Sequence, residues 1–194
     1  MAAEHVCPWW LAYTFDHPGR YLYQRPQKML GGYVAPGMTV MDVGCGMGFF
    51  SIAMARMIGE RGAVIAVDLQ QKMLDVLMKR AKRKRLAARI RPHCCEQHRL
   101  GVLEPVDFVI ACYVVHEVPD PDRLFTEIRA CLKPNAKLLV VEPGWHVPQN
   151  AFEKSMAVAQ SVGLRVADRP PCRVDRAVLL EKTPEREDGP GPVC

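Results

Sequence analysis

The chain has 194 residues, of which 49% are hydrophobic and 24% are charged. This length and composition are ordinary for one soluble globular domain with a buried core. The formal net charge of +5 is modest, and the absence of any apolar run near the ~20 residues that span a bilayer excludes a transmembrane segment from the prediction.

The first 35 residues contain no signal for secretion. Glu4 and His5 stand where a secretion signal carries Lys or Arg, and neither an apolar stretch nor a small-residue cleavage site follows. We therefore expect a cytoplasmic protein. The same segment is unusually aromatic, with Trp9, Trp10 and Tyr13 close together.

From Met38 onward, short apolar runs alternate with amphipathic stretches, which is typical of βα units around a parallel sheet. The predicted strands cover residues 39–43, 63–67, 88–91, 106–112 and 137–141. The predicted helices cover residues 50–58, a stretch ending near Leu86, residues 121–132 and residues 149–162. Two last strands, residues 164–167 and 176–180, follow without a helix between them and are expected to pair as a hairpin.

These elements predict a single-domain α/β fold, a doubly wound Rossmann-like sheet of about seven strands, mostly parallel with an antiparallel edge strand. The predicted core spans residues 36–182, preceded by the aromatic arm of residues 1–35. Residues 183–194 are rich in Pro, Gly and charge, and we expect them to be disordered.

A glycine-rich loop, Gly44-Cys45-Gly46-Met47-Gly48, follows the first predicted strand and precedes a helix. Glycine permits a tight turn there and lets a ligand approach the backbone. The spacing does not fit the dinucleotide fingerprint GxGxxG, because Phe49 occupies the place of the third glycine. The loop also lacks the Gly-Lys-Ser/Thr ending of a phosphate-binding P-loop.

An acidic residue, Asp68, follows the second predicted strand. The carboxyl ends of parallel strands form the ligand-binding edge of such a sheet, and a carboxylate there can accept both hydroxyl groups of a ribose. Enzymes that bind NAD carry an acid at the same place, so Asp68 predicts a ribose without naming the cofactor.

Four stretches in order resemble the class I S-adenosylmethionine (SAM)-dependent methyltransferases. The last of them resembles the signature of the small-molecule branch that includes the ubiquinone and menaquinone methylases, and the likeness covers about residues 36–182. The four stretches are Val40-Met-Asp-Val-Gly-Cys-Gly-Met-Gly48, Val64-Ile-Ala-Val-Asp68, Val106-Asp-Phe-Val-Ile110 and Leu124-Phe-Thr-Glu-Ile-Arg-Ala-Cys-Leu-Lys-Pro134. The turn after Pro134 departs from the usual Gly-Gly, but Asn135 tolerates a left-handed backbone.

The resemblance implies SAM as the cofactor, a small-molecule methyl acceptor and no metal. It also implies a cofactor site at the glycine loop, in which the glycines turn beneath the methionine portion and Asp42 orders the loop and meets the amine through water. Asp68 binds the ribose, and the sulfonium lies near the fourth strand. The implied cofactor-binding residues are Asp42, Gly44, Cys45, Gly46, Gly48, Asp68, Leu69, Cys95, Glu96, Cys112 and Tyr113.

The position expected to bind the adenine departs from the family pattern, and the aromatic arm has two possible roles. The family often has an Asp that accepts the adenine amino group where this chain has His93-Cys94-Cys95-Glu96, and a thiol such as that of Cys95 is a poor acceptor, so either Glu96, one step later, or backbone groups accept it. Arms such as residues 1–35 often fold over the cofactor in this family, and aromatic faces suit a cation. The alternative is that the arm covers an apolar patch at the edge of the sheet.

The candidate catalytic residues are His116 and Glu117, just after the fourth strand. An imidazole can act as a general base near neutral pH; the alternative is that His116 only shapes its loop. Glu142 and His146, after the fifth strand, form a second pair at the same edge and could contact the acceptor or cap the loop.

Other functions are compatible with parts of this pattern. The basic run of residues 79–85 could contact nucleic acid, but no aromatic residues interleave with it, so we interpret it as a solvated helix face. Five cysteines could lie at or near the ligand edge and hold a soft metalloid such as trivalent arsenic: Cys7, Cys45, Cys94, Cys95 and Cys112. A nicotinamide-dependent oxidoreductase, a SAM-binding protein without transferase activity and an RNA or protein methyltransferase are the remaining alternatives.

Overall fold

The structure is a computed structural model that describes residues 19–20, 24–172 and 174–183. Most of the predicted aromatic arm and all but the first residue of the predicted disordered tail lie outside these residues. Both therefore stay predictions. The described part of the chain contains no helix that is long and apolar enough to cross a membrane.

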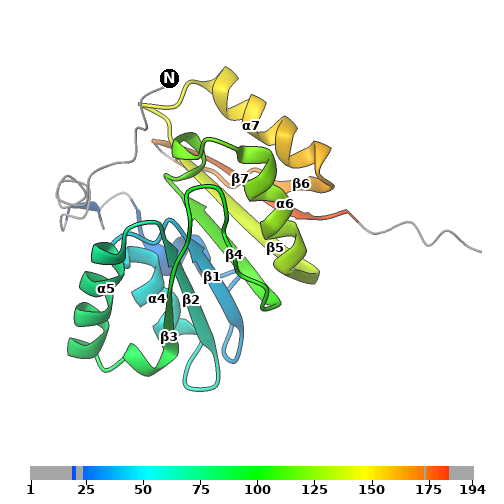
Figure 1. Ribbon diagram of the computed structural model, residues 1–194. Helices are drawn as coiled ribbons and strands as arrows, with labels where there is room; N and C mark the ends of the chain where they lie inside the picture. The colour runs from blue at the N-terminus through cyan, green and yellow to red at the C-terminus, as the bar shows by residue number, and fades with distance from the viewer. Residues whose placement is uncertain (1–18, 21–23, 173, 184–194) are drawn as a thin grey trace, which may run out of the picture.

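One seven-stranded sheet forms the centre of the molecule, in the order β3-β2-β1-β4-β5-β7-β6 (Figure 1). The strands β1 to β5 run parallel, and β7 runs antiparallel to both of its neighbours. The strands are β1 (Thr39–Val43), β2 (Ala63–Asp68), β3 (Ile90–Cys94), β4 (Val106–Cys112), β5 (Leu132–Pro143), β6 (Leu164–Asp168) and β7 (Asp175–Lys182). The predicted Rossmann-like fold and the hairpin of its last two strands are confirmed. Because β7 inserts between β5 and β6, the antiparallel strand lies one place inside the edge.

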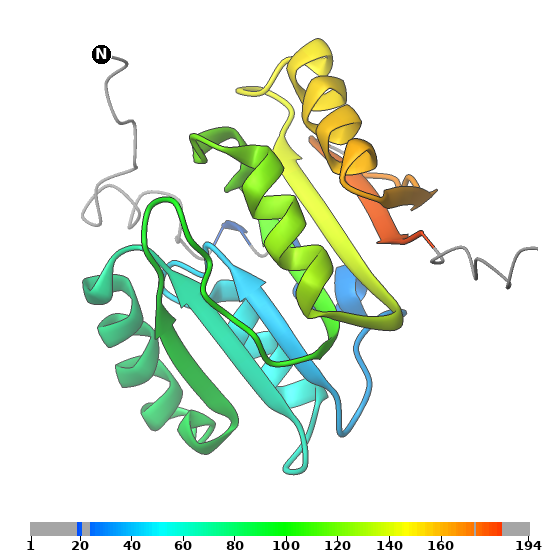
Figure 2. The same ribbon diagram turned by 45° about the vertical axis from the view of Figure 1, so that its right-hand side comes forward.

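Helices cover both faces of the sheet (Figures 1 and 2). One buried cluster joins α6 and α7 to one face, and a second cluster joins α3, α4 and α5 to the other face. The helices are α3 (Pro26–Leu30), α4 (Phe49–Met57), α5 (Gln71–Arg83), α6 (Pro121–Cys131) and α7 (Gln149–Ser161), with short 3-10 turns η1 (Ala87–Arg89) and η2 (Val115–Glu117).

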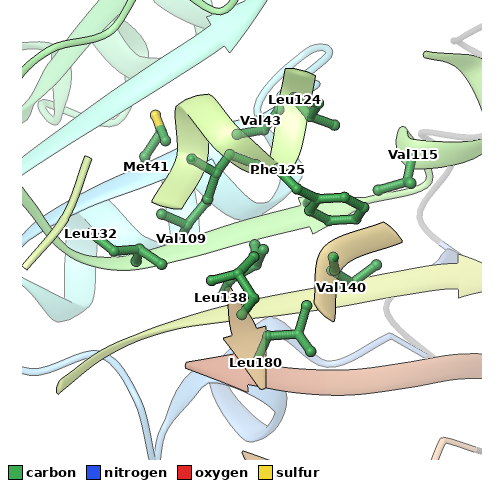
Figure 3. Packing of buried hydrophobic residues seen from close by; sticks show 14 of the residues in the cluster. Met41, Val43, Val109, Val115, Leu124, Phe125, Leu132, Leu138, Val140 and Leu180 are labelled. Carbon is green, nitrogen blue, oxygen red and sulfur yellow. The ribbon is translucent and has the colours of Figure 1, made fainter. Parts of the chain in front are cut away.

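The face beneath α6 shows how the core holds the strands of the site in place. Phe125 of α6 is fully buried and packs in one cluster with Val115 of η2 and Val140 of β5 (Figure 3). Burial of such a side chain contributes about 1.5–3 kcal/mol to stability. At the start of α6, Asp120 accepts a hydrogen bond from the Arg123 amide and Pro121 occupies the first turn, as the sequence predicts.

Two predicted boundaries are wrong in a way that the backbone explains. The helix α5 ends at Arg83 rather than near Leu86, because Arg85 adopts a left-handed backbone with φ 58°. The next residues form η1, so β3 begins at Ile90 rather than at residue 88.

The turn predicted before the fifth strand is part of β5 itself. Val106 of β4 pairs with Leu132, and Phe108 pairs with Lys137, so residues 133–136 form an irregularity within the strand. Asn135 has φ 64° there, in agreement with the left-handed conformation that its side chain tolerates.

Candidate functional site

A cavity of about 580 Å³ lies at the carboxyl ends of β1, β2 and β4. This is the point where the strand order reverses between β1 and β4, and ligands of open α/β sheets bind at such a point. The volume falls within the range of about 300–1,000 Å³ that small-molecule sites occupy. The residues that the sequence singles out and that line the cavity are Gly44, Cys45, Gly46, Asp68, Leu69, Cys95, Glu96, Cys112, Tyr113, His116, Glu117 and His146.

Two of the implied cofactor-binding residues, Asp42 and Gly48, are not among those that line the cavity. Asp42 is buried on β1, and its carboxylate accepts a hydrogen bond from the Ser51 hydroxyl on α4. Burial raises the pKa of Asp42 to about 7. Asp42 therefore joins the strand before the glycine loop to the helix after it.

The glycine loop has a left-handed backbone at each of its glycines. At Gly44, with φ 66°, an added Cβ would lie 2.6 Å from Val114 Cγ2. At Gly46, with φ 51°, an added Cβ would meet no atom within 4 Å. The first glycine thus lets two loops pack closely, whereas the second leaves open space beside the backbone, as a cradle for a ligand requires.

Asp68 ends β2 and is 8% exposed. Its Oδ2 accepts a hydrogen bond from the Gly46 amide at 2.8 Å, and its Oδ1 accepts one from the Gln70 amide at 2.9 Å. Burial raises the pKa of Asp68, although these backbone hydrogen bonds oppose that shift. Each carboxylate oxygen retains a lone pair, so the side chain can accept two further hydroxyl groups.

The loop after β3 forms the neighbouring wall. The Cys95 amide donates to the Asp68 carbonyl at 3.0 Å, and the exposed Glu96 closes a tight turn through its amide and the Arg99 carbonyl, also at 3.0 Å. Burial raises the pKa of Cys95 to about 11, so its thiol is neutral and a weak hydrogen-bond acceptor. Glu96 is the stronger acceptor of the two.

A polar pair beside the cavity joins η2 to the end of β5. His116, on η2 after β4, is hydrogen-bonded through Nδ1 to the carboxylate of Glu142, near the end of β5. Glu142 is 2% exposed and also accepts a hydrogen bond from the Val115 amide at 2.8 Å. Glu117, the partner expected from its place in the sequence, lies 4.0 Å from His116 Nε2.

The electrostatic surroundings of His116 follow from this pairing. Burial alone would lower the pKa of His116, but the hydrogen bond to Glu142 and the charges of Glu142 and Glu117 together raise it. Because Nδ1 faces Glu142, the nitrogen that remains for a ligand is Nε2. Both members of the second predicted pair lie at this edge: Glu142 is hydrogen-bonded to His116, and the ring centroid of His146 lies 5.2 Å from that of His116.

Sequence reasoning missed Arg20 and its partners Gln24 and Asp175, which no local pattern marks. Arg20 lines the cavity, and its Nε donates to Gln24 Oε1 at 2.6 Å. Gln24 Nε2 donates to Asp175 Oδ2 at 2.9 Å. Arg20 and Gln24 therefore lie at the same sheet edge as the glycine loop.

The cysteines do not assemble into a metal-binding group within the described residues. Cys45, Cys95 and Cys112 line the cavity, while Cys94 is exposed and contacts the Leu69 carbonyl. Cys7 lies outside the described residues. Nothing in this arrangement supports metalloid binding.

A family model described as a methyltransferase domain matches residues 40–135, which run from β1 into β5 and contain the glycine loop, Asp68 and His116. The chain belongs to the class I SAM-dependent methyltransferases. This confirms the resemblance predicted from the sequence. SAM is accordingly the cofactor that membership implies.

Known members of this methyltransferase family resemble the chain over part of their length. The demethylmenaquinone methyltransferase of Lactobacillus johnsonii is 33% identical over 110 residues, which is 56% of this chain and 45% of that protein. The ubiquinone biosynthesis O-methyltransferase of Caulobacter vibrioides is 32% identical over 131 residues, 64% and 51% of the two chains. The chain spans about half the length of these curated relatives.

A solved structure of a SAM-dependent methyltransferase from Aquifex aeolicus shares the fold. It superposes with a TM-score of 0.81 at 23% identity, over 90% of this chain and 98% of that chain. The residues of the cavity fit SAM on their own chemistry: open space lies beside Gly46, and the carboxylate of Asp68 stands at the end of the next strand.

Proposed function

We propose that this protein transfers the methyl group of SAM to a hydroxyl group of a small aromatic acceptor. The observation that carries the proposal is the hydrogen-bonded pair of His116 and Glu142 at the edge of the cavity. A histidine whose orientation is fixed by a buried carboxylate is the arrangement that general-base catalysis uses.

The cofactor would be held by groups from three strand ends. Asp68 accepts the ribose hydroxyls, and Leu69 lies against the adenine. The open backbone at Gly46 takes the methionyl portion. Glu96 is placed on the loop after β3 to accept a hydrogen bond from the adenine amino group.

When bound, SAM would supply an electrophilic methyl group on a positively charged sulfur, and that sulfur would keep the electron pair of the broken bond as neutral S-adenosylhomocysteine. His116 removes the hydroxyl proton at Nε2, so the oxygen gains the electron pair that forms the new bond. Glu142 holds the Nδ1 proton in place and stabilises the imidazolium that results. The protein otherwise contributes position and the exclusion of water.

The wall beside His116 suits a planar ring. Trp145 lines the cavity, is 66% exposed, and its ring lies 5.5 Å from that of His146. An exposed tryptophan at the edge of a cavity is a stacking surface for an aromatic ligand. Two curated relatives are named demethylmenaquinone methyltransferase and ubiquinone biosynthesis O-methyltransferase; the first name supports a ring compound as the acceptor, and the second supports transfer to oxygen.

The test is transfer of a labelled methyl group from SAM to a panel of hydroxylated rings, with 1,4-dihydroxynaphthalene and catechol as probes and cyclohexanol as the aliphatic control. We expect turnover of at least one aromatic probe, none of cyclohexanol, and a higher KM for that probe in Trp145→Ala. Tight binding of SAM without turnover of any ring would overturn the proposal and favour a SAM-binding protein that transfers no methyl group.

A further inference from the structure

The loop that follows β4 carries both Tyr113 and His116 and contains an unusual backbone. Tyr113 has φ 62°, in the left-handed region that few residues other than glycine adopt. A residue persists in that region where its surroundings hold it, and such residues gather at functional sites. Tyr113 and His116 both line the cavity. The contacts that hold this loop therefore decide where the imidazole lies.

The later part of the loop is held by Glu142 of β5. Its carboxylate accepts a hydrogen bond from the Val115 amide and is hydrogen-bonded to His116. At the start of the loop, the Tyr113 amide donates to the Val141 carbonyl at 2.8 Å. These contacts fix the backbone at residues 113 and 115, but they do not fix the direction of the Tyr113 side chain.

A second carboxylate holds that side chain. Asp175, the first residue of β7, accepts a hydrogen bond from the Tyr113 hydroxyl through Oδ1. Burial and this hydrogen bond raise the pKa of Tyr113, so the hydroxyl keeps its proton and donates. Oδ2 of Asp175 accepts a hydrogen bond from Nε2 of Gln24 at 2.9 Å, and Gln24 is 1% exposed. Because each oxygen has its own partner, the carboxylate keeps one orientation and Tyr113 is held with it.

The sheet topology explains how a residue so late in the chain reaches this loop. β7 runs antiparallel to β5, and Asp175 pairs with Pro143, next to Glu142 (Figure 1). The start of β7 therefore lies at the edge of the sheet where β4 and β5 end. Asp175 is not among the residues that line the cavity, so it acts on the site through Tyr113.

We propose that Asp175 is a positioning residue for methyl transfer, because it holds Tyr113 and with it the loop that carries His116. The inference rests on the proposed function, which makes His116 the base. Loss of the hydrogen bond between Asp175 and Tyr113 lets the loop shift and moves the imidazole away from the acceptor oxygen. A displacement of about 1 Å at a reacting group can lower the rate about 100-fold.

The experiment compares the wild-type protein with Tyr113→Phe, Asp175→Ala and the double variant. Tyr113→Phe removes only the hydroxyl, whereas Asp175→Ala also removes the bond to Gln24. Glu181→Ala is the matched control, because Glu181 lies on the same strand, forms an ion pair with Arg165 and pairs with Lys137 away from the cavity. Hydrogen–deuterium exchange of residues 112–118 is measured by mass spectrometry, and kcat and KM are measured with the aromatic probe.

We expect faster exchange of residues 112–118 in Tyr113→Phe and in Asp175→Ala, and no change in Glu181→Ala. In the same two variants kcat should fall about 10- to 100-fold, while KM for the acceptor changes less than about threefold. The double variant should be no slower than Asp175→Ala, since both substitutions break the same hydrogen bond. A purely structural role for Asp175 would lower the melting temperature without this split between kcat and KM.

Unchanged exchange in both variants would overturn the inference, and so would faster exchange with an unchanged kcat. Losses of kcat that multiply in the double variant would show two independent effects and would also count against it. In each of these cases turnover by the wild-type protein leaves the proposed function standing. If the wild-type protein turns over no aromatic probe, the proposed function fails and this inference fails with it.

Discussion

His116 and Glu142 are hydrogen-bonded across the ends of two adjacent parallel strands, although 26 positions separate them in the sequence. The register of β4 and β5 pairs Cys112 with Val141, so the segments that follow these residues leave the sheet side by side. Glu142 also holds the backbone of η2 through the Val115 amide. One buried carboxylate thus fixes both the imidazole and the turn that carries it.

Replacement of His116 tests its role as the base. His116→Gln should lower kcat for a hydroxyl acceptor by about 100- to 10,000-fold, the usual contribution of a general base. The affinity for S-adenosylhomocysteine, measured by calorimetry, should stay within about twofold of wild type. His146→Gln is the control, since the His146 ring centroid lies 5.2 Å from that of His116, whereas the hydrogen bond to Glu142 is made by His116. Equal losses in both variants would contradict a specific role for His116.

The pH dependence of transfer follows from the raised pKa of His116. Only the neutral imidazole accepts a proton, so kcat/KM should rise with pH and reach half its maximum above the ordinary histidine value of 6.5. Glu142→Gln removes the negative charge that raises this pKa, while burial, which lowers it, remains. The midpoint should therefore move to lower pH. A midpoint that stays in place in this variant would show that another group titrates.

Asp42 should make the stability of the fold depend on pH. Its pKa is raised by burial from the ordinary 3.8 to about 7. Between these pH values the folded state binds more protons than the unfolded state. The stability that protonation of Asp42 contributes is therefore fully present below pH 3.8 and is lost as the pH rises to 7. In Asp42→Asn, the free energy of unfolding should fall less steeply with pH over this window than it does in the wild-type protein. The two slopes should differ by up to about 1.4 kcal/mol per pH unit.

Urea denaturation at several pH values between 4 and 7 measures this slope. Ser51→Ala is the matched variant, because it removes a hydrogen bond that lowers the pKa of Asp42 and should extend the window toward higher pH. If the free energy of unfolding changes with pH by the same slope in wild type and Asp42→Asn, Asp42 does not titrate in this range.

Gly44 and Gly46 should respond differently to alanine. Both variants incur the cost of a left-handed residue, about 1–2 kcal/mol. Gly44→Ala also drives a methyl group into Val114, so thermal denaturation should show the larger loss of stability there. Gly46→Ala should lose more affinity for S-adenosylhomocysteine than stability, because its methyl group enters open space beside the cavity. A larger loss of stability than of affinity for S-adenosylhomocysteine in Gly46→Ala would show that Gly46 does not contact the ligand.

The fold was predictable because its signals are local. Apolar runs, the glycine loop and Asp120 before Pro121 mark where strands and helices begin and end, and the parallel strand ends locate the cavity. The left-handed residue Arg85, which ends α5 early, carries no such signal, since arginine is a favourable helix residue.

The partners within the site were harder to predict. Sequence proximity pairs His116 with Glu117, whereas sheet order pairs it with Glu142. Arg20 is held at the cavity by a hydrogen bond to Gln24, and Gln24 is hydrogen-bonded to Asp175, which lies 151 positions further along the chain. Contacts of this kind are set by the insertion of β7 beside β5, which brings the start of β7 to the carboxyl edge of the sheet.

We propose that the cavity at the ends of β1, β2 and β4 binds SAM through Asp68. Calorimetric titration of wild type and Asp68→Asn with S-adenosylhomocysteine and, separately, with NADH tests this proposal most directly. We expect saturable binding of S-adenosylhomocysteine by the wild-type protein, binding weakened about tenfold or more by Asp68→Asn, and no heat of binding from NADH. Binding of NADH without S-adenosylhomocysteine, or equal affinity of the two proteins for S-adenosylhomocysteine, would contradict it.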